Sequence, residues 1–494
     1  MNIGFFFLLL PSKPFLEKMM RIVVCRRVAL RCLSCLFSLF PLWMMAGEYE
    51  RYYTQLPVSL SEPMAPVIPD HRVTVTDFGA VGDGVQSDTE AFAKAISALT
   101  KQGGGHLVVP AGVYLCGMIS LKDNIDLHLE RNAMLLFSPD KKDFLKVDPA
   151  TGQLATDKAT PAISASKRRN VSITGEGIID GNGEWWRAVK RSKVSDVEWK
   201  MYTDLGGTVA DNGSLWYPFH LKYFDDIASD AKKQEGMRTH LIRLTDCERV
   251  LIQGVTVQNS PKFHIVPQRC KHVIIDGVTV RCPWNAQNGD GIDLMQCQEA
   301  LIVNCTVDVG DDGICMKGGV GKEGLKYGPC QNILIQDNTV FHAHGGFVIG
   351  SEFSGGMYNI VVRKNTFSST DTGLRFKSGV GRGGKTRDIF ISDIYMSDIK
   401  DQAVVFETSY ADRPVGSDGA PVQPKQEDFI PEFSDIHIQR VVCRDVKTAV
   451  AAHGTLEMIH DIFLDDCVFF YFKQDKSIDH PDMISFKNVS FHTY

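Results

Sequence analysis

"CERVLIQGVTV", residues 247–257, is the clearest of a series of related stretches that run through this 494-residue chain. Close copies are "CKHVIIDGVTV", "CQEALIVNCTV" and "CQNILIQDNTV", which begin at Cys270, Cys297 and Cys330. Weaker copies begin at Arg168, Met357, Thr386, Phe433 and Ile459. Between residues 247 and 386 the starts lie 23, 27, 33, 27 and 29 residues apart, a spacing that is typical of a solenoid.

Each unit holds two short β-rich runs joined by a glycine or polar kink, which leaves no room for a helix. One such coil cannot bury its own inward face, whereas stacked coils share a continuous core. Leucine-rich repeats would need regularly spaced leucines, and a β-sandwich would not produce this period. We therefore predict an all-β fold, a right-handed, single-stranded parallel β-helix, as one domain over residues 47–494.

A capping helix is predicted at the N-terminal end of this domain, from about Asp88 to Leu99, with Ser87 and Glu90 at capping-box spacing. We expect it to cover the open end of the coil stack, where strand edges would otherwise be exposed. Two segments break the period and are predicted to be loops beside the solenoid: 185–237, rich in Trp, Tyr, Lys and Asp, and 413–431, rich in Pro and Gly. Long excursions of this kind tend to gather on the binding face.

Residues 1–46 differ in composition from the rest of the chain. A basic segment, 21–32, leads into an apolar run, 33–47, which is the pattern of a secretory signal peptide. Pro41 interrupts the run, which is shorter than the roughly 20 residues of a membrane span. We expect export to the periplasm or the extracellular space without stable membrane insertion, with translation starting at Met1 or at Met19 or Met20. The alternative is a cytosolic protein with an unusual N-terminus.

Composition narrows the class of protein. The chain is 44% hydrophobic and 23% charged, with a net charge of −6, so no basic surface for nucleic acid is expected. The 13 cysteines form no close CxxC pair and accompany no histidine cluster, which argues against a zinc site. We expect the ten cysteines after the leader to be small core residues, with one or two disulfides left open. No cofactor or metal is expected, and we expect a monomer.

Four polar positions recur at about one coil's spacing. The gaps between them are 21, 33 and 31 residues, and the positions are Asp290, Asp311, His344 and Arg375. Because equivalent residues in stacked strands lie about 4.8 Å apart, we predict a ladder of these groups on one side of four successive coils. Lys377 shares the face of Arg375, and the glycines of "GDDG" permit bends that turn both Asp311 and Asp312 the same way.

These motifs have plainer interpretations. Asp, Asn and Gly favour turns, where they make local hydrogen bonds. The acidic cluster could also hold calcium, although His344, Arg375 and Lys377 beside it argue against a cation site. Four such motifs in consecutive coils, ending in a cationic pair, favour a functional site instead.

The ordered set "NGDGID" (288–293), "GDDG" (310–313), "HG" (344–345) and "RFK" (375–377) resembles glycoside hydrolase family 28, the polygalacturonase family. The resemblance implies an inverting glycosidase in which Asp311 is the general acid and Asp290 and Asp312 hold and activate water. It implies that His344 keeps the acid correctly protonated. It also implies that the substrate is bound by Arg375, Lys377, Tyr410 and Asn288.

General physical chemistry is consistent with these roles for the aspartates. Inverting hydrolysis needs an acid and a base about 6.5–9.5 Å apart, and crowded carboxylates raise the pKa of one of their number. We expect Asp293 to support the site structurally. Trp185, Trp186 and Trp216 could stack on sugars or could pack the 185–237 insertion onto the solenoid.

We therefore expect a pectin hydrolase that cleaves α-1,4-galacturonosyl linkages, with a pectic polysaccharide or oligogalacturonide as substrate. Gly289 between Asn288 and Asp290 resembles exo-acting relatives, so we expect exo action. One alternative is a hydrolase of a decorated backbone, rhamnogalacturonan or xylogalacturonan. Another is a β-helix pectate lyase or a non-catalytic pectin-binding protein.

Overall fold

The computed structural model describes residues 47–146, 159–210, 212–218, 238–410 and 428–494. The chain divides into two compact units, residues 1–55 and 56–494. In the first, the described part contains a 3-10 helix, η1 (Glu50–Tyr53). The leader predicted over 1–46 lies outside the described residues. The second unit carries the fold and the candidate site.

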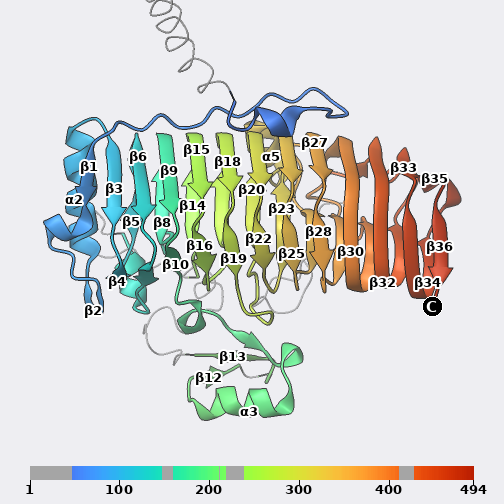
Figure 1. Cartoon of the computed structure of the whole chain (residues 1–494). Helices are drawn as coiled ribbons and strands as arrows, with labels where there is room; N and C mark the ends of the chain where they lie inside the picture. The colour runs from blue at the N-terminus through green and yellow to red at the C-terminus, as the bar shows by residue number, and fades with distance from the viewer. Residues whose placement is uncertain (1–46, 147–158, 211, 219–237, 411–427) are drawn as a thin grey trace, which may run out of the picture. The chain divides into compact units, whose positions relative to one another are not determined.

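The second unit is a parallel β-helix, and it confirms the predicted fold (Figure 1). Its strands form three faces, each built of parallel strands from successive coils. Face 1 contains β1 (Arg72–Thr74), β3 (Gly105–Val109), β6 (Ile125–Leu129), β9 (Arg169–Gly175), β15 (Glu248–Gln253), β18 (Lys271–Asp276), β21 (Gln298–Val303), β24 (Cys330–Gln336), β27 (Met357–Arg363), β31 (Glu432–Phe433), β33 (Ile462–Asp465) and β35 (Ile484–Lys487).

Face 2 contains β2 (Asp83–Ser87), β4 (Gly112–Cys116), β7 (Ala133–Phe137), β10 (Ile178–Asp180), β16 (Thr256–Gln258), β19 (Thr279–Arg281), β22 (Thr306–Asp308), β25 (Thr339–Phe341), β28 (Thr366–Ser368) and β36 (Ser490–Thr493). Face 3 contains β5 (Ile119–Ser120), β8 (Ile163–Ser166), β14 (Ile242–Thr245), β17 (Ile265–Gln268), β20 (Ile292–Met295), β23 (Asp312–Lys317), β26 (Gly345–Ile349) and β29 (Thr372–Lys377). Near the C-terminus β30 (Lys385–Glu407) and β32 (Ile436–His453) run through all three faces, and β34 (Val468–Ile478) runs through two.

We expected two β-strands in each repeat unit, but most coils have three. The quoted repeat covers face 1, the kink and face 2, as in β15, Gly254 and β16. The kink is left-handed in each clear copy, with φ of 77° at Gly254 and 56° at Asn304 and Asp337, which suits Gly and Asn best. The third strand, on face 3, precedes each repeat start.

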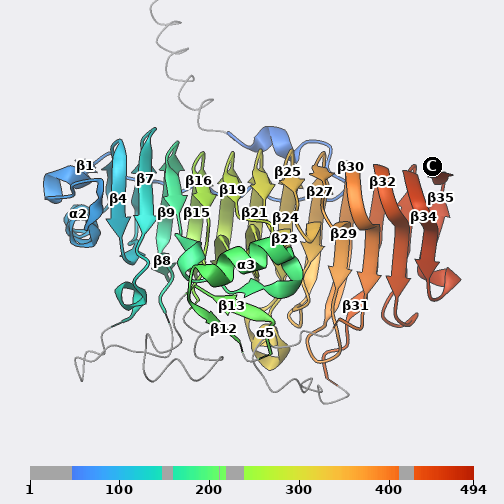
Figure 2. The same cartoon turned by 90° about the horizontal axis from the view of Figure 1, so that it is seen from below.

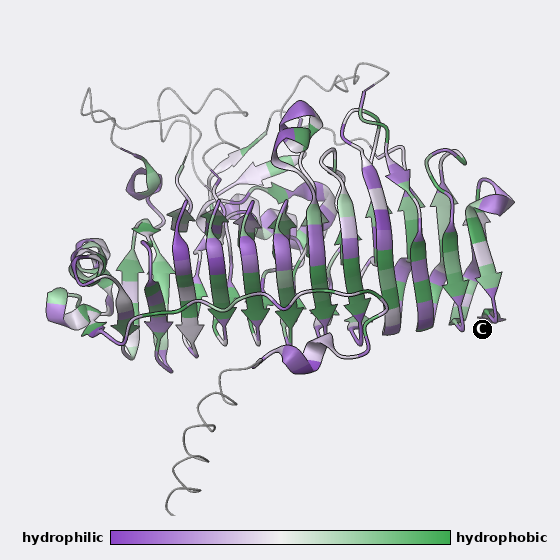
Figure 3. Cartoon of the chain, turned by 90° about the horizontal axis from the view of Figure 1, so that it is seen from above, coloured by the Kyte–Doolittle hydropathy of each residue, from purple (hydrophilic) through white to green (hydrophobic). Residues whose placement is uncertain are grey.

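The core forms in register because equivalent residues stack from coil to coil. On face 1, one such row is Val250, Val273, Ala300, Ile333 and Ile360, all of them fully buried. Figure 3 shows hydrophobic segments at similar levels on neighbouring strands. Full burial of such a side chain stabilises the fold by roughly 1.5–3 kcal/mol, so the stack replaces the core that a single coil lacks.

All ten cysteines in the described residues are buried and unbridged, which confirms their interpretation as core residues. Cys247, Cys270, Cys297 and Cys330 occupy the same position in successive repeats. Burial raises the pKa of Cys305 and Cys330 to about 12, so these thiols stay protonated and unreactive at neutral pH.

The predicted N-terminal helix is present as α2 (Thr89–Lys101), and it packs Phe92, Ile96 and Leu99 into the hydrophobic core at the first coil (Figure 1). The predicted capping box is wrong. The N-cap is Asp88, and its carboxylate accepts hydrogen bonds from the backbone N–H groups of Val81 and Gly82 at 2.7 and 3.2 Å. Other short helices are η2 (Val75–Phe78), η3 (Lys141–Phe144), α5 (Gly321–Tyr327) and η7 (Pro481–Met483).

The insertion predicted as a loop is folded in its described part. It contains η4 (Gly183–Trp185), β11 (Val189–Lys190), η5 (Arg191–Lys193), α3 (Asp196–Asp204), β12 (Thr208–Val209) and β13 (Leu215–Tyr217). The strands form a separate antiparallel sheet around a small core of Val189, Val194 and Trp216. We call residues 183–217 the insertion layer, which crosses several coils in Figure 2. Of the second predicted loop, 413–431, only residues 428–431 are described.

Within the described residues, no helix has the length and apolar character needed to cross a membrane.

Candidate active site

The two adjacent aspartates lie where the chain enters face 3. Asp312 is the first residue of β23, and its backbone N–H donates a hydrogen bond to Asp311 Oδ1 at 3.1 Å. The flanking glycines allow close approach rather than the bends that we expected, since neither is left-handed. A Cβ at Gly310 would lie 2.3 Å from the carbonyl oxygen of Trp284, and one at Gly313 would lie 2.5 Å from a methyl carbon of Val340.

Strand register places one pair of the predicted ladder, Asp311 and His344, opposite each other. The backbone N–H of His344 donates to the carbonyl of Asp311 at 2.8 Å, so these residues are neighbours in adjacent coils. Asp312 pairs with Gly345, which pairs with Thr372. The last rung of the predicted ladder is therefore wrong, because Arg375 pairs with Val348, four positions beyond His344.

Arg375 and Lys377 nevertheless reach the aspartates through their long side chains. Lys377 Nζ lies 2.7 Å from Asp312 Oδ2, and an Arg375 guanidinium nitrogen lies 3.3 Å from Asp312 Oδ1. Burial alone would raise the pKa of Asp312, but the charges of Lys377 and Arg375 outweigh burial and lower it below the ordinary value.

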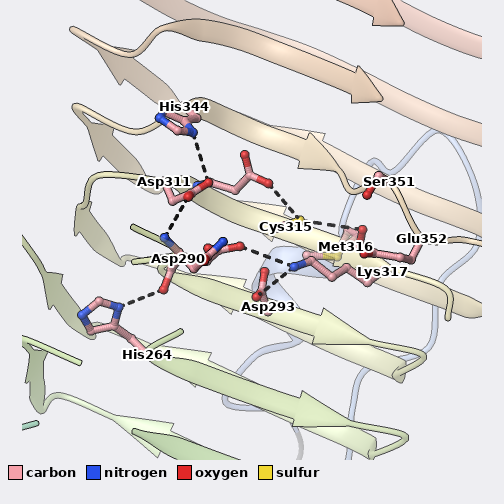
Figure 4. A network of polar contacts seen from close by, with 12 residues as sticks. His264, Asp290, Asp293, Asp311, Cys315, Met316, Lys317, His344, Ser351 and Glu352 are labelled. Atoms are coloured by element: carbon pink, nitrogen blue, oxygen red, sulfur yellow. Dashed lines mark hydrogen bonds and ion pairs between the residues drawn. The ribbon is translucent and has the colours of Figure 1, made fainter. Parts of the chain in front are cut away.

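Asp311 is also held as a carboxylate. Its Oδ1 lies 3.1 Å from His344 Nδ1, and its Oδ2 accepts a hydrogen bond from the backbone N–H of Asn288 at 3.1 Å (Figure 4). Burial opposes ionisation here too, but the hydrogen bond from His344 and the nearby charges of Lys377 and Lys193 lower the pKa of Asp311.

Asp290 has the opposite character. Its side chain is buried, with Oδ2 3.4 Å from Lys317 Nζ and with Oδ1 lacking a hydrogen-bond partner among the described residues. Burial, followed by the negative charge of Asp293, raises the pKa of Asp290 well above its ordinary value. Burial likewise raises the pKa of Asp293 to about 6. Neighbouring carboxylates do raise the pKa of one aspartate, as expected. In this structure, without substrate, the aspartate with the raised pKa is Asp290 rather than Asp311.

Two residues that sequence reasoning missed fix Asp290. Lys317 Nζ lies between Asp290 and Asp293, at 3.4 and 3.3 Å, and 4.1 Å from the ring centre of Phe263. His264 Nε2 accepts from the backbone N–H of Ser260, so its Nδ1–H donates to the carbonyl of Asp290 at 2.8 Å (Figure 4). Burial lowers the pKa of His264 to about 4, which keeps the ring neutral. In the sequence, the only sign of a role for Lys317 is its charge at the end of the apolar stretch of β23.

Residues 194–458 of this chain match the family described as glycosyl hydrolases family 28. The chain belongs to that family. Residues 72–137 also match a family described as rhamnogalacturonase A/epimerase, pectate lyase-like.

Curated relatives support the family 28 assignment. The chain is 31% identical over 341 residues to a probable polygalacturonase of Vitis vinifera, covering 67% of this chain and 62% of the relative. It is 29% identical over 384 residues to an exo-poly-alpha-D-galacturonosidase of Dickeya chrysanthemi, covering 76% and 62%. The chain thus spans about three fifths of the length of these two relatives.

Solved structures support the fold of this family 28 chain. An exopolygalacturonase from Thermotoga maritima superimposes with a TM-score of 0.70 at 30% identity, covering 87% of this chain and 94% of that one. A family 28 exopolygalacturonase from Yersinia enterocolitica superimposes with a TM-score of 0.62 at 24% identity, covering 85% and 78%.

Two of the residues predicted to bind substrate, Asn288 and Tyr410, lie beside positively charged side chains. Asn288 Oδ1 accepts from Arg238 at 2.7 Å, so this side chain is held by a third residue that sequence reasoning missed. Tyr410 lies beside the cationic pair, with its ring centre 5.0 Å from Lys377 Nζ and 5.8 Å from the Arg375 guanidinium carbon.

The tryptophans of the insertion are divided between packing and exposure. Trp186 and Trp216 are buried, which supports the packing interpretation for both. Trp185 is 51% exposed, and Trp284, which sequence reasoning did not single out, is 55% exposed. These two rings remain available for contact with a sugar.

Ligand atoms of Asp311, Asp312 and His344 lie within 4.8 Å of one another, a spacing that could hold a cation. Lys377 and Arg375 already contact Asp312, so a metal ion would compete with two positive charges for the same oxygens. The expectation that the reaction needs no metal stays a prediction.

Proposed function

We propose that this chain hydrolyses α-1,4-galacturonosyl linkages of pectin with inversion of configuration. The observation that carries the proposal is the contact of Asp312 with the Arg375–Lys377 pair from two coils further on, with Asp311 beside Asp312 and Asp290 on the preceding coil. Carboxyl groups supply general acid and base, and the cationic pair suits a substrate whose sugar carries a carboxylate.

In the proposed reaction, Asp311 gives its proton to the glycosidic oxygen as the C–O bond breaks. Asp312, whose pKa is lowered, takes a proton from the water that attacks the anomeric carbon from the opposite side. Asp290, whose raised pKa makes it a poor base, orients that water. Afterwards Asp312 returns its proton to solvent and Asp311 takes one up.

Asp311 must gain a proton before it can act. Without substrate, His344, Lys377 and Lys193 lower its pKa. A bound uronate would place its negative charge beside Lys377 and Arg375. It would thereby weaken the electrostatic stabilisation that these cations give to the ionised aspartates. We propose that substrate binding thereby raises the pKa of Asp311, because a nearby anion favours the neutral acid.

Exo action is proposed from the insertion layer. The layer packs against the edge of the coils that precede the site, where it lines an open cavity of about 650 Å³ together with residues of β10, β16, β19 and β22. Lys193 of this layer reaches the carbonyl of Gly310, beside Asp311. A layer in this position would limit how far a polymer extends on that side of the site. The likeness to the Thermotoga maritima exopolygalacturonase also supports exo action.

The same cavity favours a second candidate, hydrolysis of a decorated pectin. Its lining combines aromatic rings, including Trp185 and Tyr202, with three acidic groups, Asp180, Glu184 and Asp308, and two arginines, Arg187 and Arg281. Aromatic rings stack on sugars, and the excess of one negative charge gives a uronate no net attraction, which favours a neutral sugar. A neutral side-chain sugar would therefore suit this cavity.

The test is a time course of purified protein on polygalacturonate in the presence of a chelator. Galacturonate from the earliest samples, with little fall in viscosity, is expected for exo action. Proton NMR of the first product should show the β-anomer. Early oligomers would contradict exo action. Cleavage only of a branched pectin would move the assignment to the second candidate. An unsaturated product absorbing in the ultraviolet would indicate a lyase.

We also propose that residues 1–46 direct export and that the exported protein is a monomer. N-terminal sequencing of protein recovered from the periplasm or the culture fluid should show a start near Gly47. Retention of the whole leader in the cytosol would contradict export. Light scattering should give the mass of one chain.

A further inference from the structure

One side chain of the insertion layer enters the catalytic cluster. Lys193, the last residue of η5, places its Nζ 3.3 Å from His344 Nε2 and 3.3 Å from the carbonyl oxygen of Gly310. The two contacts join residues 151 and 117 positions apart in the sequence. Lys193 is half-buried, and burial lowers the pKa of its ammonium, partly offset by the negative charge of Asp311.

The turn that carries Lys193 is firmly held. Just before it, the backbone N–H of Arg191 donates to the carbonyl of Ser214 at 2.9 Å. Just after it, Val194 lies in the small core of the layer, and Ser195 forms a capping box with Glu198 at the start of α3. A lysine on such a turn loses less conformational freedom on making its contacts than one on a loose loop.

The chemistry of the contact fixes the state of His344. An ammonium group has only donors, so a hydrogen bond from Lys193 requires His344 Nε2 to be an acceptor. The ring proton must then be on Nδ1, which faces Asp311 Oδ1 at 3.1 Å. Asp371 Oδ2 lies 3.7 Å from Nε2, beyond hydrogen-bond reach, while its other oxygen accepts from Lys400 at 3.2 Å.

We propose that Lys193 is a positioning residue that holds His344 in its neutral, Nδ1-protonated form, so that His344 donates to Asp311. Its effect on the reaction rests on the function proposed above. The charged groups around this contact are Lys190, Lys193, Asp311, Asp371, Lys377 and Lys400. The insertion would then be part of the catalytic machinery as well as a boundary for the substrate.

The direct test reads the tautomer without substrate. Protein labelled with ¹⁵N-histidine is compared at pH 7 with K193M, K193R and the control K200M. Lys200 lies on α3 of the same layer, exposed and paired with Asp204. H344Q identifies the signals of His344 among the 14 histidines.

Wild type, K193R and K200M should show a bare, acceptor-type Nε2 and a protonated Nδ1 for His344. In K193M the Nε2 signal should shift to that of a protonated nitrogen, because its donor is gone and Asp371 is the nearest remaining partner. An unchanged His344 spectrum in K193M would overturn the proposal. Circular dichroism of K193M should match wild type.

The kinetic test uses polygalacturonate. K193M should lower kcat at least about tenfold with KM changed less than about twofold, and K193R should recover most of the loss, because a donor to the ring is restored. A normal kcat in K193M would overturn the catalytic importance of Lys193. Inactive wild-type protein would overturn the proposed function alone, because the tautomer measurement does not depend on activity.

Discussion

Lys377 Nζ lies 2.7 Å from Asp312 Oδ2, and both residues are more than nine-tenths buried. Neither charge can be solvated by water, so each relies on the other and on Arg375. Asp312, the proposed base, and Lys377, a proposed substrate-binding residue, therefore each depend on the charge of the other. Changing either residue alone should affect activity and stability together.

Replacing Asp312 with Asn should lower kcat by about 10²–10⁴-fold, the usual range for a general base. It should also destabilise the fold by about 3–5 kcal/mol, because Lys377 becomes an uncompensated buried cation. Kinetics and denaturant unfolding measure the two effects. The double variant D312N/K377M should recover stability but not activity. The exposed control D461N should change neither.

Replacing Arg375 with Gln should weaken the binding of an acidic substrate. Loss of a charge-assisted hydrogen bond costs about 1.5–3 kcal/mol, which is roughly 10- to 150-fold in kcat/KM on polygalacturonate. The exposed Arg387, whose guanidinium lies over Tyr358 on face 1, offers the control R387Q. If R375Q and R387Q behaved alike, a role of Arg375 in binding the uronate would be excluded.

Stability should depend on pH through Asp293. Its pKa rises from an ordinary 3.8 to about 6 on folding, so the folded state binds a proton more readily than the unfolded state. A raised acid pKa lowers stability above pH 6, and this loss, at most about 3 kcal/mol, is recovered as the pH falls towards 4.

The comparison of wild type with D293N tests this contribution together with the effect of the Asp293 charge on the pKa of Asp290, because Asn does not titrate. Between pH 7 and pH 5 the free energy of unfolding of wild type should rise by about 1 kcal/mol relative to D293N, measured by guanidinium unfolding at both values. D293N also removes the ion pair between Asp293 and Lys317. This loss lowers the free energy of unfolding at both pH values, so it cancels in the difference between them. The control D204N, at an exposed site where Asp204 is paired with Lys200, should follow wild type. Parallel curves for wild type and D293N would contradict the prediction.

Chelation should leave activity unchanged. The oxygens that could hold a cation near Asp312 are already contacted by Lys377 and Arg375, so EDTA should alter the initial rate by less than about twofold. Calcium added after chelation serves as the control. A large loss in EDTA that calcium restores would point to a metal-dependent reaction such as that of a lyase.

The repeat was enough to predict the solenoid because its inward rows of Val and Ile recur at fixed positions on faces 1 and 2. It did not reveal face 3, where the strands lie before each repeat start and follow turns of varied length, such as those before β20 and β23. The site is on this least regular face. For the same reason, spacing alone placed Arg375 opposite His344, while the true register pairs it with Val348, four residues further along.

Motif order identified the acidic groups but could not assign their pKa values. These depend in part on Lys317 and Lys193, which approach from a strand of the solenoid and from the insertion layer. A sequence read in one dimension does not show that Lys193 lies beside His344. It also underestimated the insertion, whose small core of Val189, Val194 and Trp216 has no repeating pattern.

The row of unbridged thiols inside the coil stack has a consequence for how this protein must be made. Each of the ten cysteines in the described residues is shielded once its coil is covered by the next, and each is accessible before that. If the chain folds after export into an oxidising compartment, coil stacking competes with thiol oxidation, and a premature disulfide would trap a misaligned stack. Refolding yield should therefore depend on keeping the chain reduced until the solenoid has closed over its sulfur atoms.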